Sequence, residues 1–531
     1  MQHNRGDTLN TLLIVLYVVA AYFLLIIGLW KSGIAARYNI GFAGPIAMVR
    51  TERGKKFLDY LSKPVRFWTA YARASRVLFV AGMAGMVLLL LWEATLVFQI
   101  PKQSIPSPQT YLLLPGINPF VPVGYGILAL VVAVVLHELS HGILSRAQNI
   151  KVKSMGVLFM IVPIGAFVEP DQEQLESAEP LRRIRVYGVG PATNIILALI
   201  FLLILVFPVM GAVTPVHAGL AAMSVYDGSS AYAAGIRPWS EIVAIGGQPV
   251  TTAQQFSGIS GIQPGSRTVV EYLAGGGYHN ATVTAGVVIT AIVPSSPAQQ
   301  AGLSPGMVIL SMNNSVVYNT DGLLSNFGNT YPNETVPFTF LAPNGTQIAK
   351  SITLSSMQSV EGVSTHGRQI GFLGIYPAYL GIGAAPVSSL LSLLSNPFYG
   401  ASSLTNLPKS ALQYVLLPFE GLSPVPQGLQ SLLSVPGLSG TGLQLFWMTA
   451  NSLYWLFWIN LWVGLFNMLP AVPLDGGYLY KDNLRLLLKK VMAGRSDDYR
   501  ERMTGTVTKF FSIMILVLLL WQILGPRLIN I

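Results

Sequence analysis

Long apolar stretches constrain this chain more than any other feature of its sequence. A helix that crosses a membrane needs about 20 mostly apolar residues, and six stretches approach or exceed that length. They are Thr8–Trp30, Val77–Phe98, Val121–Ser145, Ile184–Met210, Phe446–Leu469 and Phe510–Leu524, of which the last is the shortest. Only 10% of the 531 residues are charged, whereas a soluble protein has about a quarter. The sequence therefore predicts a polytopic α-helical membrane protein whose first span is retained rather than cleaved as a signal peptide.

Basic residues lie beside the predicted spans. The formal net charge is +10, which can indicate nucleic-acid binding when the charges cover one soluble domain. Here they fall in the loops between the first and second, third and fourth, and fifth and sixth stretches. Because cytoplasmic loops are rich in Lys and Arg, we expect a multi-pass protein of the cell membrane with these loops inside. Both termini and the insert from about Gly211 to Gly442 then lie outside, and no nucleic-acid partner is expected.

The insert has a different composition and contains a repeat. It is rich in Gly, Ser, Thr and Pro, which is typical of β structure joined by turns. A segment that begins at Ser229 recurs at Ser295, and in each copy we expect a short helix ending at Gly235 or Gly302, then a turn and an apolar strand. The second copy resembles the PDZ domains attached to bacterial and archaeal membrane proteases. This resemblance implies two tandem PDZ-like domains, which either bind extended peptides at a sheet edge or shield the membrane domain.

The third apolar stretch contains the motif His137-Glu138-Leu139-Ser140-His141. Residues four apart lie on one face of a helix, so both imidazoles can reach one metal ion while Glu138 lies beside a bound water. The motif also occurs by chance, and a polar cluster at a helix end is the alternative. An ionisable residue inside a span costs a few kcal/mol or more and is usually functional, which favours metal binding. Since the chain has no cysteine, further ligands must come from histidine, carboxylate or other oxygen atoms.

Two histidines do not complete a catalytic zinc site, which usually has three protein ligands and a position for water. The fifth apolar stretch ends in the sequence Asn467-Met-Leu-Pro-Ala-Val-Pro-Leu-Asp475-Gly-Gly. Pro470 and Pro473 prevent a regular helix there, and Asp475 would lie at about the depth of His141 if the two spans pack together. Taken alone, Asp475 and its glycines are also compatible with a simple turn at a helix end.

Three motifs in this order resemble the site-2 protease family of intramembrane zinc metalloproteases. They are LHELSHG at Leu136–Gly142, GPATN at Gly190–Asn194 and NMLPAVPLDGG at Asn467–Gly477. The resemblance covers about 120–208 and 446–479. It implies that His137, His141 and Asp475 bind Zn²⁺, that Glu138 is the general base, and that Asn467 steadies the substrate carbonyl or the developing oxyanion. A hydrogen bond between helices is the alternative role of Asn467.

Two further segments are interpreted with the help of this resemblance. Gly190 and Pro191 are expected to allow close helix packing, and Asn194 is a structural residue that could donate a hydrogen bond to a group beside the metal. The segment 157–168 is apolar but is broken by Pro and Gly. The family implies membrane-associated β structure here, with a substrate-binding edge strand formed by Gly165, Ala166, Phe167 and Val168. The residues alone would also allow a re-entrant loop.

The chain is therefore predicted to consist of a helical membrane core and an external β-rich insert. The predicted regions are 1–118 (two spans), 119–211 (first part of the catalytic core), 212–285 and 286–377 (PDZ-like domains), 378–442 (an apolar connector broken by Pro and Gly, with interfacial helices), 443–482 (second part of the core) and 483–531 (a basic loop and the last span).

The predicted function is hydrolysis of peptide bonds in or near the transmembrane segments of membrane-anchored proteins, with the lipid bilayer as the surroundings of the reaction. One alternative is a non-catalytic scaffold or chaperone that binds extended segments through the PDZ-like domains. Such a protein is expected to lack Glu138 or a metal ligand, and here none is missing. A metal transporter would have polar residues distributed through the membrane, whereas those of this chain are grouped at one level.

Overall fold

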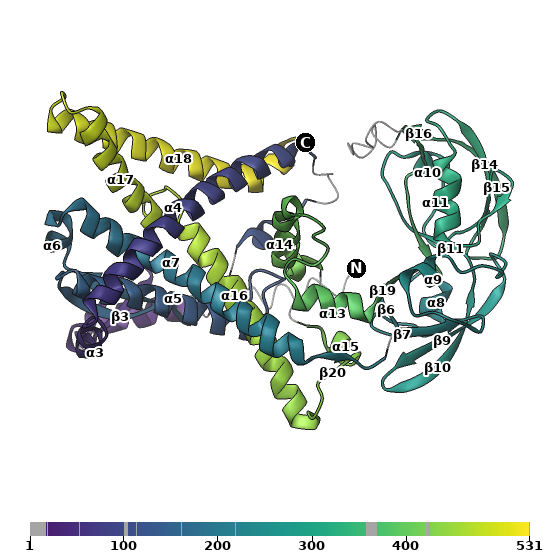
Figure 1. The fold of residues 1–531 in the computed structure, drawn as a ribbon, viewed down its shortest axis with the longest axis horizontal. Coiled ribbons are helices and arrows are strands. Elements are labelled where there is room, and N and C mark those ends of the chain that lie inside the picture. Colours follow the sequence, from purple (N-terminus) through teal and green to yellow (C-terminus); the bar gives the residue numbers. More distant parts are fainter. Residues whose placement is uncertain are drawn as a thin grey trace. The chain divides into compact units, whose positions relative to one another are not determined.

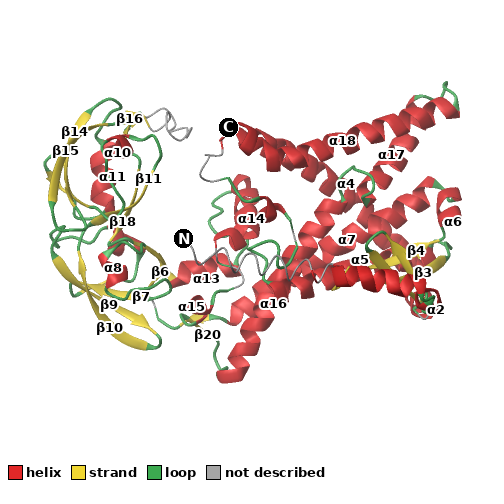
Figure 2. Ribbon diagram, turned by 180° about the vertical axis from the view of Figure 1, so that it is seen from behind, coloured by secondary structure: helices red, strands yellow, loops and turns green. Residues whose placement is uncertain are grey.

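The computed structural model describes residues 17, 20–51, 54–99, 105–112, 114–160, 162–217, 219–356, 369–420, 422 and 425–529 (Figure 1). The chain forms two compact units, which are described separately. The first unit comprises Met1–Ile204 and Asn451–Ile531, and the second comprises Leu205–Ala450. Helices dominate the first unit and strands are concentrated in the second (Figure 2).

Among the residues that the structure describes, four helices are long and apolar enough to cross a membrane. They are α4 (Val65–Leu96), α5 (Val123–Ala147), α7 (Pro180–Ile204) with its continuation to Ala212, and α18 (Asp497–Ile529). The fifth predicted stretch forms α16 (Gly440–Asn467), which has no charged residue but is not among these four. The first predicted stretch lies partly outside the described residues, and its described part includes an apolar helix, Ala20–Lys31. The protein is therefore a helical membrane protein, and the count of six spans stays a prediction.

The last helix differs from its predicted length. The apolar pattern placed only 510–524 in a span, whereas α18 has 33 residues and begins at Asp497. Its polar first half is held against α17 (Asp475–Val491) by Arg485, whose Nε donates to Glu501 Oε2 at 2.8 Å. The search for apolar stretches did not include this polar half, because it packs against the charged helix α17 rather than against lipid.

A four-stranded antiparallel sheet lies beside α5 in the first unit (Figure 2). Its order is β1 (Ile40–Ala43), β2 (Ile46–Thr51), β3 (Val152–Met160) and β4 (Val162–Pro170). The two hairpins are distant in sequence, and they pair because Gly156 of β3 has no side chain. A Cβ there would lie 2.1 Å from the carbonyl oxygen of Val49 in β2. The re-entrant loop was therefore the wrong alternative, and the residues 165–168 lie on the edge strand β4.

The second unit contains two sheets with the same strand order. The first is β10 (Gly277–Thr284), β9 (Arg267–Ala274), β7 (Glu241–Ile245), β6 (Leu220–Val225) and β19 (Ile382–Pro386); the second is β15 (Gln347–Thr353), β14 (Thr335–Leu341), β12 (Val308–Met312), β11 (Val287–Ile292) and β18 (Ile375–Tyr379). Two-residue strands, β8 (Gln248–Pro249) and β13 (Ser315–Val316), pair with β7 and β12. A structural repeat predicts that the strands of both sheets follow the same order, as they do here.

The local structure of the repeat is confirmed. In the first copy α8 (Ser230–Ala233) is followed by Gly235, whose φ is +97°, and by β7; in the second, α10 (Pro297–Gln300) is followed by Gly302, whose φ is +66°, and by β12. A simple tandem order is not observed, because β19 follows β18 in the chain but pairs with β6 of the first sheet. The second module is therefore inserted before the last strand of the first, and the region that begins at residue 378 contributes to the first sheet.

Short helices follow the sheets in the second unit. They are α13 (Val387–Ser395), α14 (Leu407–Leu416) and α15 (Gln427–Gln430), and β20 (Leu433–Ser434) pairs with β5 (Thr214–Pro215). A helix of ten residues is about 15 Å long, which is half of the hydrocarbon thickness of about 30 Å. None of these helices can span a bilayer, and their predicted interfacial position remains untested.

Candidate metal centre

The helix α5 presents both histidines of the predicted motif on one face. His137 and His141 are 6% and 8% exposed. His141 Nδ1 lies 2.7 Å from the carbonyl oxygen of Val186 in α7. Since a carbonyl can only accept, Nδ1 carries the proton and Nε2 keeps its lone pair for a metal. This contact orients the ring in the way that metal-binding histidines are usually oriented.

Asp475 reaches the histidines from a third segment of the chain. It is the first residue of α17, and the non-helical residues 468–474 connect it to the end of α16. Two glycines allow this segment to fold tightly over the start of α17. A Cβ at Gly476 would lie 2.1 Å from the carbonyl oxygen of Leu469, and one at Gly477 would lie 2.4 Å from the backbone nitrogen of Val472. The glycines of the motif are therefore required by backbone contacts.

The three predicted ligand atoms converge. Asp475 Oδ2 is 3.0 Å from His137 Nε2 and 3.3 Å from His141 Nε2, and the two nitrogens are 3.2 Å apart. Zinc–ligand bonds of about 2.0–2.1 Å in a tetrahedral site separate the ligand atoms by about 3.3 Å. Among the described residues these three side chains form the group able to hold a metal ion. The donor set and its spacing fit Zn²⁺ with one position left for water.

Gly190 lies directly against this centre. A Cβ on Gly190 would lie 2.3 Å from His141 Nε2 and 2.7 Å from His137 Nε2. The next residue, Pro191, contacts a different helix, since a Cβ on Gly464 of α16 would lie 3.0 Å from the Pro191 carbonyl oxygen. Asn194 is fully buried, and its side-chain atoms have no hydrogen-bond partner among the described residues. The close approach at Gly190 fits the expected packing, and a role of Asn194 beside the metal stays a prediction.

Glu138 connects the centre to the edge strand. Its Oε2 accepts a hydrogen bond from the backbone N–H of Val168, with an N–O distance of 3.0 Å. The N–H of Val168 therefore points away from β3, its partner in the sheet. Because hydrogen-bonding directions alternate along an antiparallel strand, the N–H of Ala166 also points away from β3. The hydrogen bond from Val168 places this strand edge beside the carboxylate of Glu138. The residues 165–168 are half-buried.

Asn467 is placed differently from the other predicted residues. It is the last residue of α16, and its Nδ2 donates to the carbonyl oxygen of Val463 at 3.1 Å. This bond lies within its own helix, so it is neither a contact with a second helix nor a contact with the metal ligands. The second hydrogen of the amide nitrogen is not used by this bond, and the role of Asn467 toward a substrate stays a prediction.

Comparisons with known proteins agree with this geometry. The model of the family described as Peptidase family M50 matches residues 125–516, a range that contains all of the residues brought together here. The chain is also similar to an uncharacterized protein of Methanocaldococcus jannaschii, with 31% identity over 163 residues. This match covers 30% of the chain and 42% of the relative. The matched region thus spans less than half of that relative.

Proposed function

The chain belongs to peptidase family M50, whose members are metallopeptidases, and from this premise we propose that it is a zinc-dependent endopeptidase acting within the membrane. The observation that carries the proposal is the convergence of three ligand atoms within 3.3 Å of one another, in a unit of long apolar helices. Its substrates are membrane-anchored proteins, cut in or near their transmembrane segments. Metal analysis of the purified protein, followed by incubation with transmembrane peptides, tests the proposal.

We assign a different chemical role to each group of side chains at the centre. His137, His141 and Asp475 would hold Zn²⁺, which lowers the pKa of bound water toward about 7 and polarises the scissile carbonyl. Glu138, oriented by the N–H of Val168, takes the proton of the attacking water and returns it to the leaving amine. Asn467 donates a hydrogen bond to the developing oxyanion through its amide NH₂ group, which has a second hydrogen beside the one given to the Val463 carbonyl oxygen.

A substrate helix must open before it can be cut. Each carbonyl in a helix is hydrogen-bonded within its own segment, and an unpaired backbone group in lipid costs several kcal/mol. The outward-facing groups of β4 beside Glu138 are suited to pair with the opened segment by strand addition. A transmembrane peptide with Gly, Pro or Asn near the scissile bond is therefore expected to be cut faster than the same peptide with Leu at those positions. Equal rates, measured in the same detergent, would exclude helix opening as a limiting step.

Ala166→Pro tests the strand edge on the enzyme side. Proline removes the N–H of Ala166, which points away from β3, so the sheet loses no internal hydrogen bond at this position. Cleavage is expected to slow by about tenfold, corresponding to about 1.4 kcal/mol for one lost hydrogen bond, while the zinc content stays at the wild-type level. Ala166→Ser, which keeps the N–H, is the matched control. Full activity of the proline variant would contradict substrate binding at this edge.

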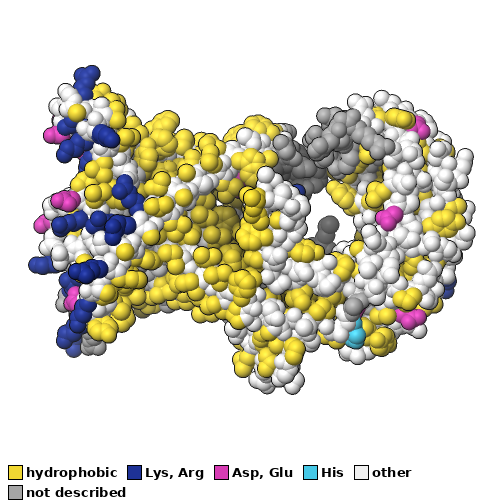
Figure 3. Space-filling view, viewed as in Figure 1, with side chains coloured by type: hydrophobic (Ala, Val, Ile, Leu, Met, Phe, Trp, Pro, Cys, Tyr) yellow, Lys and Arg dark blue, Asp and Glu magenta, His cyan; other side chains and the backbone are white. Residues whose placement is uncertain are grey.

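We further propose that the second unit is extracytoplasmic. In Figure 3 the Lys and Arg side chains gather at the end of the first unit that carries α6 (Gln172–Ser177), α3 (Lys55–Leu61) and the α17–α18 turn. Hydrophobic side chains cover the helices beyond that end. The positive-inside rule places the basic end in the cytoplasm. The chain leaves this end at Pro180, where α7 begins, and enters the second unit at Leu205 after one apolar helix. The two β modules are then outside as PDZ-like domains, where they bind extended substrate segments or shield the membrane core.

Cysteine labelling tests this orientation, because the chain has no cysteine of its own. Single cysteines at Asn313 and Asn344 of the second module are expected to react with a membrane-impermeant reagent applied outside intact cells. Cysteines at Lys56 and Ser496 are expected to react only after the membrane is opened. All four positions are exposed in the structure, so a lack of labelling reports the side of the membrane rather than burial. The reverse pattern would place the β modules in the cytoplasm.

A further inference from the structure

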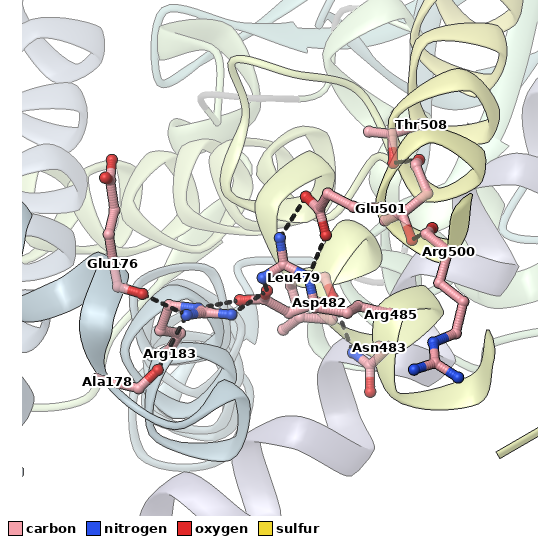
Figure 4. Close-up of polar contacts among 11 residues, drawn as sticks. Glu176, Ala178, Arg183, Leu479, Asp482, Asn483, Arg485, Arg500, Glu501 and Thr508 are labelled. Carbon is pink, nitrogen blue, oxygen red and sulfur yellow. Dashed lines mark hydrogen bonds and ion pairs between the residues drawn. The ribbon is translucent and has the colours of Figure 1, made fainter. Parts of the chain in front are cut away.

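A buried ion pair joins the helix that carries Asp475 to the helix that lies against both histidines (Figure 4). Arg183 of α7 donates from Nε and Nη2 to the two carboxylate oxygens of Asp482 in α17, both at 2.8 Å. The side chains are 9% and 6% exposed. The remaining guanidinium nitrogen, Nη1, donates to the carbonyl oxygens of Glu176 and Ala178 at 2.7 and 2.9 Å. The guanidinium is therefore fixed in position and orientation.

The ion pair lies two helical turns from the metal centre on both helices. Arg183 precedes Gly190 by seven residues, and Asp482 follows Asp475 by seven residues, so each separation is about 10.5 Å along the helix. Residues seven apart share one face of a helix. Between the two levels Tyr187 stacks on Tyr478, with ring centroids 5.3 Å apart. The same faces of α7 and α17 thus meet at the metal centre and at the ion pair.

The other contacts between these helices do not determine their register strongly. Leu479 of α17 belongs to one buried apolar cluster with Ile184 of α7, and a Cβ on Gly188 of α7 would lie 3.2 Å from Leu479 Cδ1. Such apolar contacts are non-directional. A slip of one residue moves a helix by about 1.5 Å along its axis and turns it by about 100°. A functional metal site tolerates displacements of only about 0.5 Å. A bidentate pair requires one geometry of both groups, so Arg183 and Asp482 can supply the register that apolar packing leaves open.

We propose that Arg183 and Asp482 are positioning residues of the metal centre. Their ion pair sets the register of α17 on α7 and thereby places Asp475 Oδ2 opposite the two histidine nitrogens. This inference rests on the proposed function, since it assigns a role in metal binding. It differs from a stabilising role, in which the pair contributes to folding but its geometry has no effect on zinc affinity.

The double variant Arg183→Met with Asp482→Leu separates the two roles. Replacing a buried ion pair by apolar residues of similar volume is often neutral or stabilising, whereas removing one partner leaves a buried charge unpaired. The double variant also removes the donor to the carbonyl oxygens of Glu176 and Ala178, so its unfolding temperature is expected to fall, but by less than in a variant that removes only Asp482 and leaves Arg183 buried and unpaired. Its zinc dissociation constant, measured by competition with a chelator in the same detergent, is expected to rise by about 10- to 100-fold, the range for groups that orient metal ligands. An unchanged dissociation constant would overturn the proposal.

Arg183→Lys provides a second test, which does not depend on how the double variant folds. Lysine keeps the charge beside Asp482 but cannot form the two parallel hydrogen bonds of the guanidinium. The zinc dissociation constant is expected to rise by about tenfold, and lysine is expected to retain more affinity than Arg183→Met alone. Wild-type affinity in Arg183→Lys would show that the directional geometry is not needed.

The matched control is the ion pair between Arg146 of α5 and Asp59 of α3, with Nε and Oδ1 at 3.1 Å. It involves the helix of both histidines but not α17. Arg146→Met with Asp59→Leu is expected to change the zinc dissociation constant by less than about twofold, within the range of surface ion pairs. An equal loss in this control would overturn the specific role of Arg183 and Asp482. Wild-type protein without zinc would instead overturn the proposed function itself.

Discussion

Glu138→Gln is expected to abolish peptide-bond cleavage while one zinc ion stays bound. Glutamine has the size of glutamate and can still accept the hydrogen bond from Val168, but it cannot take a proton from water. Loss of general acid–base catalysis lowers rates by about 10²- to 10⁴-fold. The measurement is the cleavage rate of a transmembrane peptide by the purified variant, together with its zinc content.

Variants of the three proposed zinc ligands are expected to behave differently from Glu138→Gln. His137→Ala, His141→Ala and Asp475→Ala each remove one of the three converging atoms, so zinc content and cleavage are expected to fall together. Among these four variants, retained zinc with lost cleavage is thus expected of Glu138→Gln alone. Substantial cleavage by purified Glu138→Gln would contradict the assigned role, and complete zinc loss in that variant would make Glu138 a ligand.

Gly190→Ala is expected to remove zinc binding although no ligand is changed. The added Cβ would lie 2.3 Å from His141 Nε2, well inside normal contact distance, and the neighbouring atom is a proposed ligand. Alanine favours a helix over glycine by up to about 1 kcal/mol, so α7 itself should not be weakened. The zinc dissociation constant is expected to rise at least about 100-fold, at the upper end of the effects seen around metal sites.

Gly188→Ala is the control for the same substitution on the same helix. A Cβ at Gly188 would lie 3.2 Å from Leu479 Cδ1, the end of a side chain that can move by a few tenths of an ångström. Most of the zinc affinity is expected to remain. Equal zinc affinity in Gly190→Ala and wild type would mean that the histidines bind metal in a geometry different from the one described.

The local motifs of the site could be read from the sequence because their geometry is local. A spacing of four residues on a helix places His137 and His141 on one face, and Pro470 and Pro473 disfavour a continuous helix before Asp475. The helix, glycine and strand order of the β repeat was predicted for the same reason. Family membership followed from three such motifs in one order, and residues 125–516 match the family.

Contacts between distant segments could not be predicted in this way. The carbonyl of Val186 that orients His141 is a backbone atom, which any residue supplies, so no residue type marks it. The pairing of β2 with β3 depends on the missing side chain of Gly156, and the return of β19 to the first sheet depends on pairing across more than 150 residues of intervening chain. The family resemblance implied a role for Asn467 in binding the substrate carbonyl. Its observed hydrogen bond to the Val463 carbonyl oxygen depends on its side-chain rotamer, which the sequence does not determine.

The buried ion pair was also missed, although its residues were visible. Arg183 lies in the basic loop between the third and fourth apolar stretches, and Asp482 lies in the basic loop between the fifth and sixth. Charge alone predicts solvent exposure or a topology signal, whereas burial of Arg183 and Asp482 depends on the contact between α7 and α17. Pairing of opposite charges across 299 residues has no signature in a single sequence.

The most direct test of metal-dependent proteolysis in the membrane is one cleavage assay with purified protein. A transmembrane peptide with a central Gly–Pro segment is incubated with the wild-type protein in detergent, and its products are identified by mass spectrometry. We expect a cut within or next to the transmembrane segment, which stops when a chelator removes the metal and resumes when Zn²⁺ is restored. Cleavage that persists without metal, or an equal rate with Glu138→Gln, would contradict the account.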